Sequence, residues 1–138
     1  MSSKNKHNKL YGSELDRSDE RIKQTQEVFT PPELIDKMIA DIPEKVLRNP
    51  NSKFMDNCAG DGNFLIQLLK SLKKYHSEQH IVDNMLYAVE LMEDNHTELC
   101  RRLNVSTDHP HYVCYNALKY HYRFDNMPDM ITIDQFFN

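Results

Sequence analysis

The chain has 138 residues, and 17 Lys and Arg against 21 Asp and Glu give it a formal net charge of -4. This length is sufficient for one domain with a core but small for a complete doubly wound enzyme, and the acidic balance disfavours unaided binding to a polyanion. Three widely spaced cysteines, an odd number, indicate reduced thiols rather than a disulfide framework.

Residues 1–24 are almost wholly polar and charged. We expect them to form an N-terminal arm or a short helix, ahead of a domain that covers residues 25–138. The opening residues contain no apolar signal core, and no apolar run is long enough to span a membrane, so the sequence predicts a cytoplasmic protein.

The segment Thr30-Pro31-Pro32-Glu33 has the Ser/Thr-x-x-Glu spacing of a capping box, with proline at the first helical position. It predicts a helix that is capped by Thr30 and ended by Pro43. The apolar face of this helix recurs at helical spacing. Its members are Leu34, Ile35, Met38, Ile39 and Ile42.

From Lys53 onward the pattern alternates between strand and helix. Strands are predicted over residues 53–56, 85–90, 111–115 and 129–134, and helices over 63–75 and 93–103. This alternation predicts an α/β fold with about four mainly parallel strands in the order 3-2-1-4 and helices on both faces of the sheet. Ligands of such sheets bind at the carboxyl ends of the strands.

A glycine loop follows the first predicted strand, in the run Asp56-Asn-Cys-Ala-Gly-Asp-Gly-Asn-Phe64. Gly60 and Gly62 can take positive φ and lack a Cβ, so the backbone can turn sharply and lie against a ligand. Leu65 stands where the dinucleotide fingerprint has its third glycine. The loop therefore favours S-adenosylmethionine over NAD, with another nucleotide or an ordinary tight turn as alternatives. Asp56 can accept hydrogen bonds from a ligand ammonium.

Two other kinds of site have weaker sequence support. His76 and His80, and the run from His109 to Cys114, do not form the two ligand pairs of a structural zinc pattern, so no metal site is expected. Cys58 has no histidine nearby in sequence that would activate it as a nucleophile.

Three motifs together resemble a known family. They are Glu27-Val28-Phe29-Thr30-Pro31-Pro32-Glu33, the glycine loop, and Tyr87-Ala88-Val89-Glu90. In order and spacing they resemble the N-terminal part of the adenine-N6 DNA methyltransferases, in the subgroup with a Thr-Pro-Pro helix ahead of the glycine loop. The resemblance covers residues 25 to about 137. It implies a partial Rossmann-like domain that uses S-adenosylmethionine to methylate adenine in DNA, as in restriction-modification systems.

The resemblance also implies a set of cofactor-binding residues. Thr30 would hold the methionine end of the cofactor. Glu90 ends the second predicted strand, where a carboxylate can accept from both ribose hydroxyls. Leu91, which follows it, can contact the adenine ring, with core packing as an equal alternative. Asn116 stands where the family commonly has an Asp, and it can still accept through its carbonyl oxygen. The full set is Phe29, Thr30, Asp56, Cys58, Ala59, Gly60, Gly62, Glu90, Leu91 and Asn116.

The candidate catalytic residues lie near the end of the chain. The family has Asn or Asp, two prolines and an aromatic residue there, and this chain has Asp134-Gln135-Phe136-Phe137. Asp134 matches the residue that accepts from the target amino group, and Phe137 matches the ring that stacks on the flipped base. Both prolines are replaced, so the direction of the backbone carbonyl is no longer fixed. The isolated chain is expected to be inactive.

The sequence stops just beyond the fourth predicted strand. We therefore expect a protein partner or a second copy to supply the missing half, and DNA to bind only the completed assembly. Two functions stay open. One is a methyltransferase fragment or subunit that needs completion, and the other is a noncatalytic relative that binds the cofactor or a partner protein.

Overall fold

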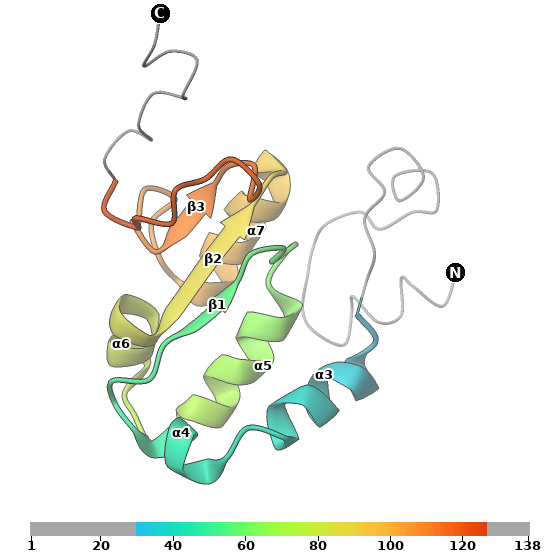
Figure 1. The fold of residues 1–138 in the computed structure, drawn as a ribbon, viewed down its shortest axis with the longest axis vertical. Coiled ribbons are helices and arrows are strands. Elements are labelled where there is room, and N and C mark those ends of the chain that lie inside the picture. Colours follow the sequence, from blue (N-terminus) through green and yellow to red (C-terminus); the bar gives the residue numbers. More distant parts are fainter. Residues whose placement is uncertain (1–29, 127–138) are drawn as a thin grey trace, which may run out of the picture.

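The computed structural model describes residues 30–126, which form a small parallel sheet with flanking helices (Figure 1). The predicted N-terminal arm and the predicted strand over residues 129–134 lie outside the described residues. The elements in chain order are α3 (Pro32–Ala40), α4 (Glu44–Arg48), β1 (Phe54–Asp56), α5 (Asn63–Leu72), α6 (Glu78–His80), the π-helical turn η1 (Ile81–Met85), β2 (Leu86–Glu90), α7 (Glu93–Leu103) and β3 (Tyr112–Cys114).

The three described strands form one parallel sheet in the order β1-β2-β3. Phe54 of β1 pairs with Leu86 of β2, and Ala88 of β2 pairs with Tyr112 of β3. The α/β prediction is confirmed, as is the 3-2-1 part of the predicted strand order. The mixed α/β arrangement is that of a partial Rossmann-like methyltransferase fold.

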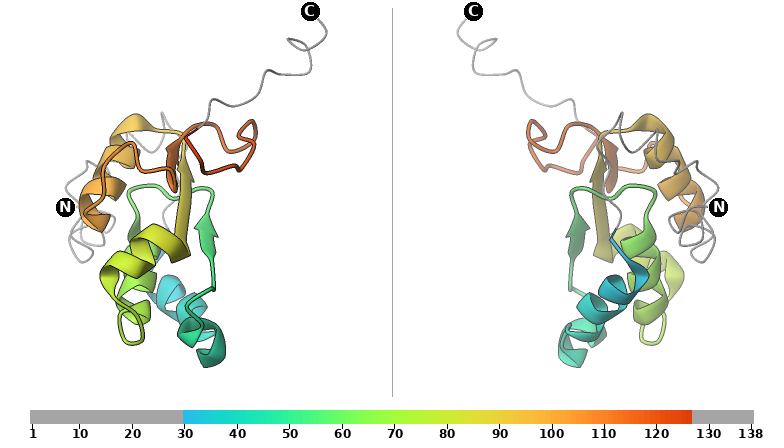
Figure 2. Two further views of the ribbon diagram at one scale, coloured as in Figure 1. Left: turned by 90° about the vertical axis from the view of Figure 1, so that its left-hand side faces the viewer. Right: turned by 90° about the vertical axis from the view of Figure 1, so that its right-hand side faces the viewer.

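Helices α5 and α7, which connect the strands, lie on the same face of the sheet (Figure 2). Leu65 of α5 and Leu99 of α7 share one buried core with Ala88 of β2. Right-handed crossovers place successive helices on one side of a parallel sheet, which explains this layer. Neither helix covers the opposite face, so the second helical layer expected from the sequence is not formed by them.

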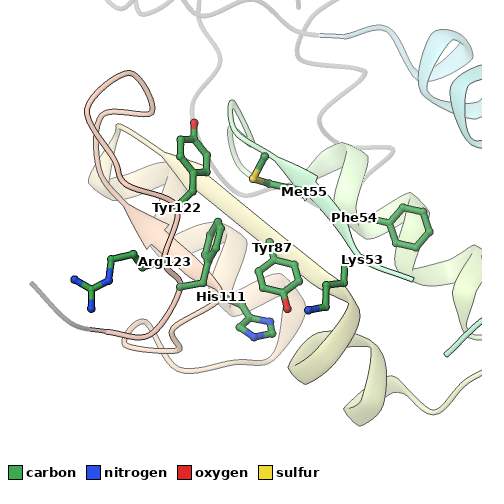
Figure 3. Close-up of a pocket in the computed structure, with 8 residues that line it drawn as sticks. Lys53, Phe54, Met55, Tyr87, His111, Tyr122 and Arg123 are labelled. Atoms are coloured by element: carbon green, nitrogen blue, oxygen red, sulfur yellow. The ribbon is translucent and has the colours of Figure 1, made fainter. Parts of the chain in front are cut away.

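The opposite face of the sheet carries a shallow groove of about 370 Å³ (Figure 3). Tyr87 and His111 stack there with ring centroids 4.0 Å apart, and Phe124 meets the Tyr87 ring edge-on at 5.0 Å. Met55, which also lines the groove, is 50% exposed. The segment that contains Tyr122 and Phe124 therefore covers only part of this face.

Helix α3 begins one residue later than the capping box predicts. Its N-cap is Pro31 (φ -59°, ψ 146°), without a side-chain cap hydrogen bond, and the carbonyl of Pro31 accepts from Leu34 and Ile35. The prediction that Thr30 caps this helix is wrong. A residue before proline is disfavoured in the helical region, so the second proline keeps Pro31 extended and moves the helix start to Pro32.

The C-terminal part of this region also differs from its prediction. Helix α3 ends at Ala40, and Pro43 is the N-cap of α4, a short helix that the sequence did not predict. Of the expected apolar face, Ile35 and Ile39 are buried. Helix α5 likewise ends at Leu72, short of residue 75, because its last turn tightens: the amide of Tyr75 donates to the carbonyl of Leu72.

Tyr112 ties β3 to the turn before β2. Its side chain is 1% exposed, and its hydroxyl donates to the carbonyl of Val82. Burial raises the pKa of Tyr112 well above its ordinary value, so the hydroxyl stays protonated.

We expect Tyr112→Phe to lower the free energy of unfolding by roughly 1 kcal/mol, because the buried carbonyl of Val82 loses its donor. Urea denaturation measures this. Tyr122→Phe, which removes an exposed hydroxyl bond to Ala117, should change stability much less.

Candidate cofactor site at the carboxyl ends of the strands

All three strands end at the same edge of the sheet, with Asp56, Glu90 and Cys114 as their last residues. The glycine loop, residues 57–62, then crosses toward β2, since the amide of Ala59 donates to the carbonyl of Val89 at 3.4 Å. The parallel register thus brings the glycine loop close to the strand that ends at Glu90, although these two motifs are far apart in sequence.

Gly60 and Gly62 both have positive φ, +58° and +96°, but their surroundings differ. A Cβ added at Gly62 would lie 2.6 Å from Cδ1 of Leu99, whereas a Cβ added at Gly60 would meet no atom of the described part of the chain within 4 Å. Gly62 therefore permits close packing of the loop on α7. Gly60 leaves open space beside the backbone, which is the space that a ligand against the loop would need.

Asp56 supports the start of the glycine loop. Its carboxylate accepts from the amide of Cys58 at 3.0 Å. Burial raises the pKa of Asp56 above its ordinary value, and that hydrogen bond partly opposes the shift. The carboxylate keeps further lone pairs with which it can accept from a ligand.

Glu90 is 7% exposed and is held from both sides. Its carboxylate accepts from the amide of Leu91 at 3.0 Å and from the side-chain amide of Asn95, on α7, at 3.4 Å. No sequence motif indicated Asn95. The side chain of Leu91 is 61% exposed beside Glu90, so it offers apolar surface to a ligand.

The other predicted residues lie in different surroundings. Ala59 is buried in the hydrophobic core, so its side chain serves packing, and Cys58 is exposed. The side-chain oxygen of Asn116 already accepts from the amide of Leu118 at 2.9 Å and retains one lone pair. Thr30 is exposed at the start of α3, which packs on α5 with its N-terminal end toward the loop (Figure 1).

Phe29 and the two candidate catalytic residues, Asp134 and Phe137, lie outside the described residues. Their assignments stay predictions.

A buried ion pair behind the loop was not predicted from the sequence. Asp61 and Arg102 lie 41 residues apart, their side chains are 3% and 4% exposed, and their charged groups approach to 3.7 Å. Nothing in the local sequence around either residue pairs them. Only the packing of α7 against the loop brings them together.

Cys58 provides a chemical probe of this site. Burial raises the pKa of its thiol, and the carboxylates of Glu90 and Asp56 raise it further. Because the thiolate is the reactive form, Asp56→Asn should speed alkylation of Cys58 a few-fold at mildly alkaline pH. Peptide mass spectrometry over time measures this. Cys114, whose raised pKa depends on burial, Glu93 and Glu90, is the internal control and should keep its rate. If Asp56→Asn leaves the alkylation rate of Cys58 unchanged, the Asp56 carboxylate does not affect the Cys58 thiol.

The histidines considered as metal ligands bind other groups. His76 and His80 bind the carbonyls of Leu47 and Pro50, at 2.7 and 2.9 Å. Within residues 30–126 no group of three or more His, Cys, Asp or Glu side chains is placed to hold a metal ion. In the same range no helix has the length and apolar character needed to cross a membrane.

Comparison with known proteins agrees with the arrangement of the loop and strands. The family model for N-6 DNA methylase matches residues 3–113, which is most of the chain and includes the glycine loop and β2. No curated protein matches the chain. On this match, with which the described parallel strands, the glycine loop after β1 and the acidic residue at the end of β2 agree, the chain belongs to the N-6 DNA methylase family.

Proposed function

We propose that this methyltransferase-like chain binds S-adenosylmethionine at the glycine loop and takes part in methylation of adenine N6 in DNA. The observation that carries the proposal is the space at Gly60, at the same sheet edge as Glu90, where an added Cβ would meet no atom of residues 30–126 within 4 Å. A ligand in that space can lie directly against the backbone.

The side chains at this edge suit the parts of the cofactor. Glu90 has two carboxylate oxygens for a pair of ribose hydroxyls, and charge strengthens such hydrogen bonds. Leu91 offers apolar surface to the adenine ring of the cofactor. The side-chain oxygen of Asn116 has one remaining lone pair that can accept from the amino group of that adenine. Asp56, Thr30 and the loop backbone would hold the methionine end. The bound cofactor would supply the methyl group.

For the reaction itself we propose that Asp134 accepts a hydrogen bond from the target amino group and that Phe137 stacks on the adenine. Gln135 and Phe136 replace the two prolines of the family motif. The replacement favours a second candidate function, a noncatalytic relative that binds the cofactor or a partner protein.

We propose further that DNA methylation requires a protein partner or a second copy of the chain. The net charge of -4 opposes unaided binding to DNA, and Met55, on the sheet face that Tyr122 and Phe124 only partly cover, is 50% exposed. Light scattering should then show association that increases with concentration, or with an added partner. A monomer at all concentrations that also methylates DNA alone would contradict this proposal.

Cofactor binding is tested by titration calorimetry with S-adenosylhomocysteine, with NAD and ATP as controls for other nucleotides. We expect binding of S-adenosylhomocysteine only. A folded protein that gives neither heat nor a thermal shift at saturating ligand would overturn the proposal. Radiolabel transfer to mixed-sequence DNA, run with the chain alone and with a partner added, then separates the two functions. A subunit transfers methyl groups once it is completed, whereas a noncatalytic relative binds the cofactor and transfers nothing in either case.

A further inference from the structure

We propose that Arg102 of α7 is a positioning residue for the cofactor, because it fixes the glycine loop in its binding conformation from behind. This inference rests on the proposed function, since it concerns the same site. Arg102 belongs to none of the sequence motifs described above, and it does not lie at the end of a strand.

The guanidinium of Arg102 holds the loop on both sides of Gly62. Its Nη1 donates to the carbonyl of Asp61 at 3.0 Å and to the side-chain oxygen of Asn63 at 2.8 Å. The same nitrogen lies 3.7 Å from the Asp61 carboxylate, and both side chains are almost fully buried. One side chain thus fixes the residues before and after the left-handed glycine.

Leu99 supports the same glycine from the preceding turn of α7. A Cβ added at Gly62 would lie 2.6 Å from its side chain, so the loop backbone already touches the helix. Residues three apart on a helix share a face, and Leu99 and Arg102 therefore act on the loop together. Helix α7 also carries Asn95, which contacts the Glu90 carboxylate. One helix supports both parts of the proposed site.

Stability alone does not account for a buried Arg at this position. A buried ion pair is often no more stabilising than apolar residues of similar volume, because both charges lose their hydration. A guanidinium differs from an apolar side chain in its directional hydrogen bonds to the loop. A loop with glycines at positions 60 and 62 loses much conformational entropy on ordering, so these bonds select one of its conformations.

The test compares S-adenosylhomocysteine affinity in Arg102→Met, Arg102→Lys and the matched control Arg101→Met. Arg101 is the neighbouring residue, is 49% exposed and pairs with Glu98 on its own helix. We expect Arg102→Met to weaken binding about tenfold or more, Arg102→Lys to restore part of it, and Arg101→Met to leave it unchanged. All affinities are measured well below each variant's unfolding temperature.

Arg102→Met leaves the Asp61 charge buried and can unfold the protein, so the double variant Asp61→Asn/Arg102→Met is included. In the folded double variant we expect weak cofactor binding and faster hydrogen exchange at residues 59–63. A purely structural role would lower the unfolding temperature but leave affinity and loop exchange unchanged, and that result would overturn the inference. If the wild-type chain binds no cofactor, the proposed function fails. Hydrogen exchange at residues 59–63 still tests whether Arg102 fixes the conformation of the loop.

Discussion

Gly60→Ala is expected to weaken binding of S-adenosylhomocysteine at least about tenfold while the protein stays folded. The described residues leave room for the new methyl group, because none of their atoms lies within 4 Å of it. A side chain at a φ of +58° costs roughly 1–2 kcal/mol of stability. The methyl group would, however, occupy the space that the ligand needs. Calorimetry gives the affinity and urea denaturation gives the stability.

Two variants serve as controls for Gly60→Ala. Asn104→Ala places alanine at nearly the same backbone conformation, φ 56°, at the end of α7, and should affect stability without changing affinity. Gly62→Ala should destabilise more than Gly60→Ala, because its Cβ would approach Leu99 to 2.6 Å. Wild-type affinity in Gly60→Ala would mean that the ligand does not lie against Gly60.

Glu90→Ala is expected to weaken cofactor binding by roughly 1–3 kcal/mol, about 5- to 150-fold, through loss of charge-assisted hydrogen bonds to the ribose. Glu90 is 7% exposed, and its carboxylate accepts from Leu91 and Asn95 before any ligand binds. Glu93→Gln, which neutralises an exposed carboxylate at the start of α7, is the matched control and should bind normally.

An analogue without the ribose hydroxyls tests the assignment of Glu90 directly. The wild-type chain should bind this analogue more weakly than S-adenosylhomocysteine, whereas Glu90→Ala should bind the two alike. The four affinities form a double-mutant cycle. If the losses of affinity from Glu90→Ala and from removal of the hydroxyls simply add, Glu90 and the hydroxyls do not interact, and the ribose assignment would be withdrawn.

Local sequence patterns predicted the three described strands and the helices between them. Apolar residues that repeat with the period of a strand or a helix mark buried faces, and parallel strands joined by helices admit few arrangements. The strand order β1-β2-β3, and the position of Glu90 at the same edge as the glycine loop, followed from these rules. Helix boundaries were less accurate. At Thr30 the spacing matched a capping box, but two successive prolines moved the helix start.

The sequence by itself determined the α/β alternation, the glycine loop and the acidic residue at the end of β2, because each depends on neighbours in the chain. Only the tertiary structure decided that Gly62 packs on α7 while Gly60 contacts none of the other described residues through an added Cβ, since the two glycines look equivalent in sequence. It also decided that Arg102 pairs with Asp61 across 41 residues. A contact of that kind depends on how a helix packs on a loop, which no local pattern encodes.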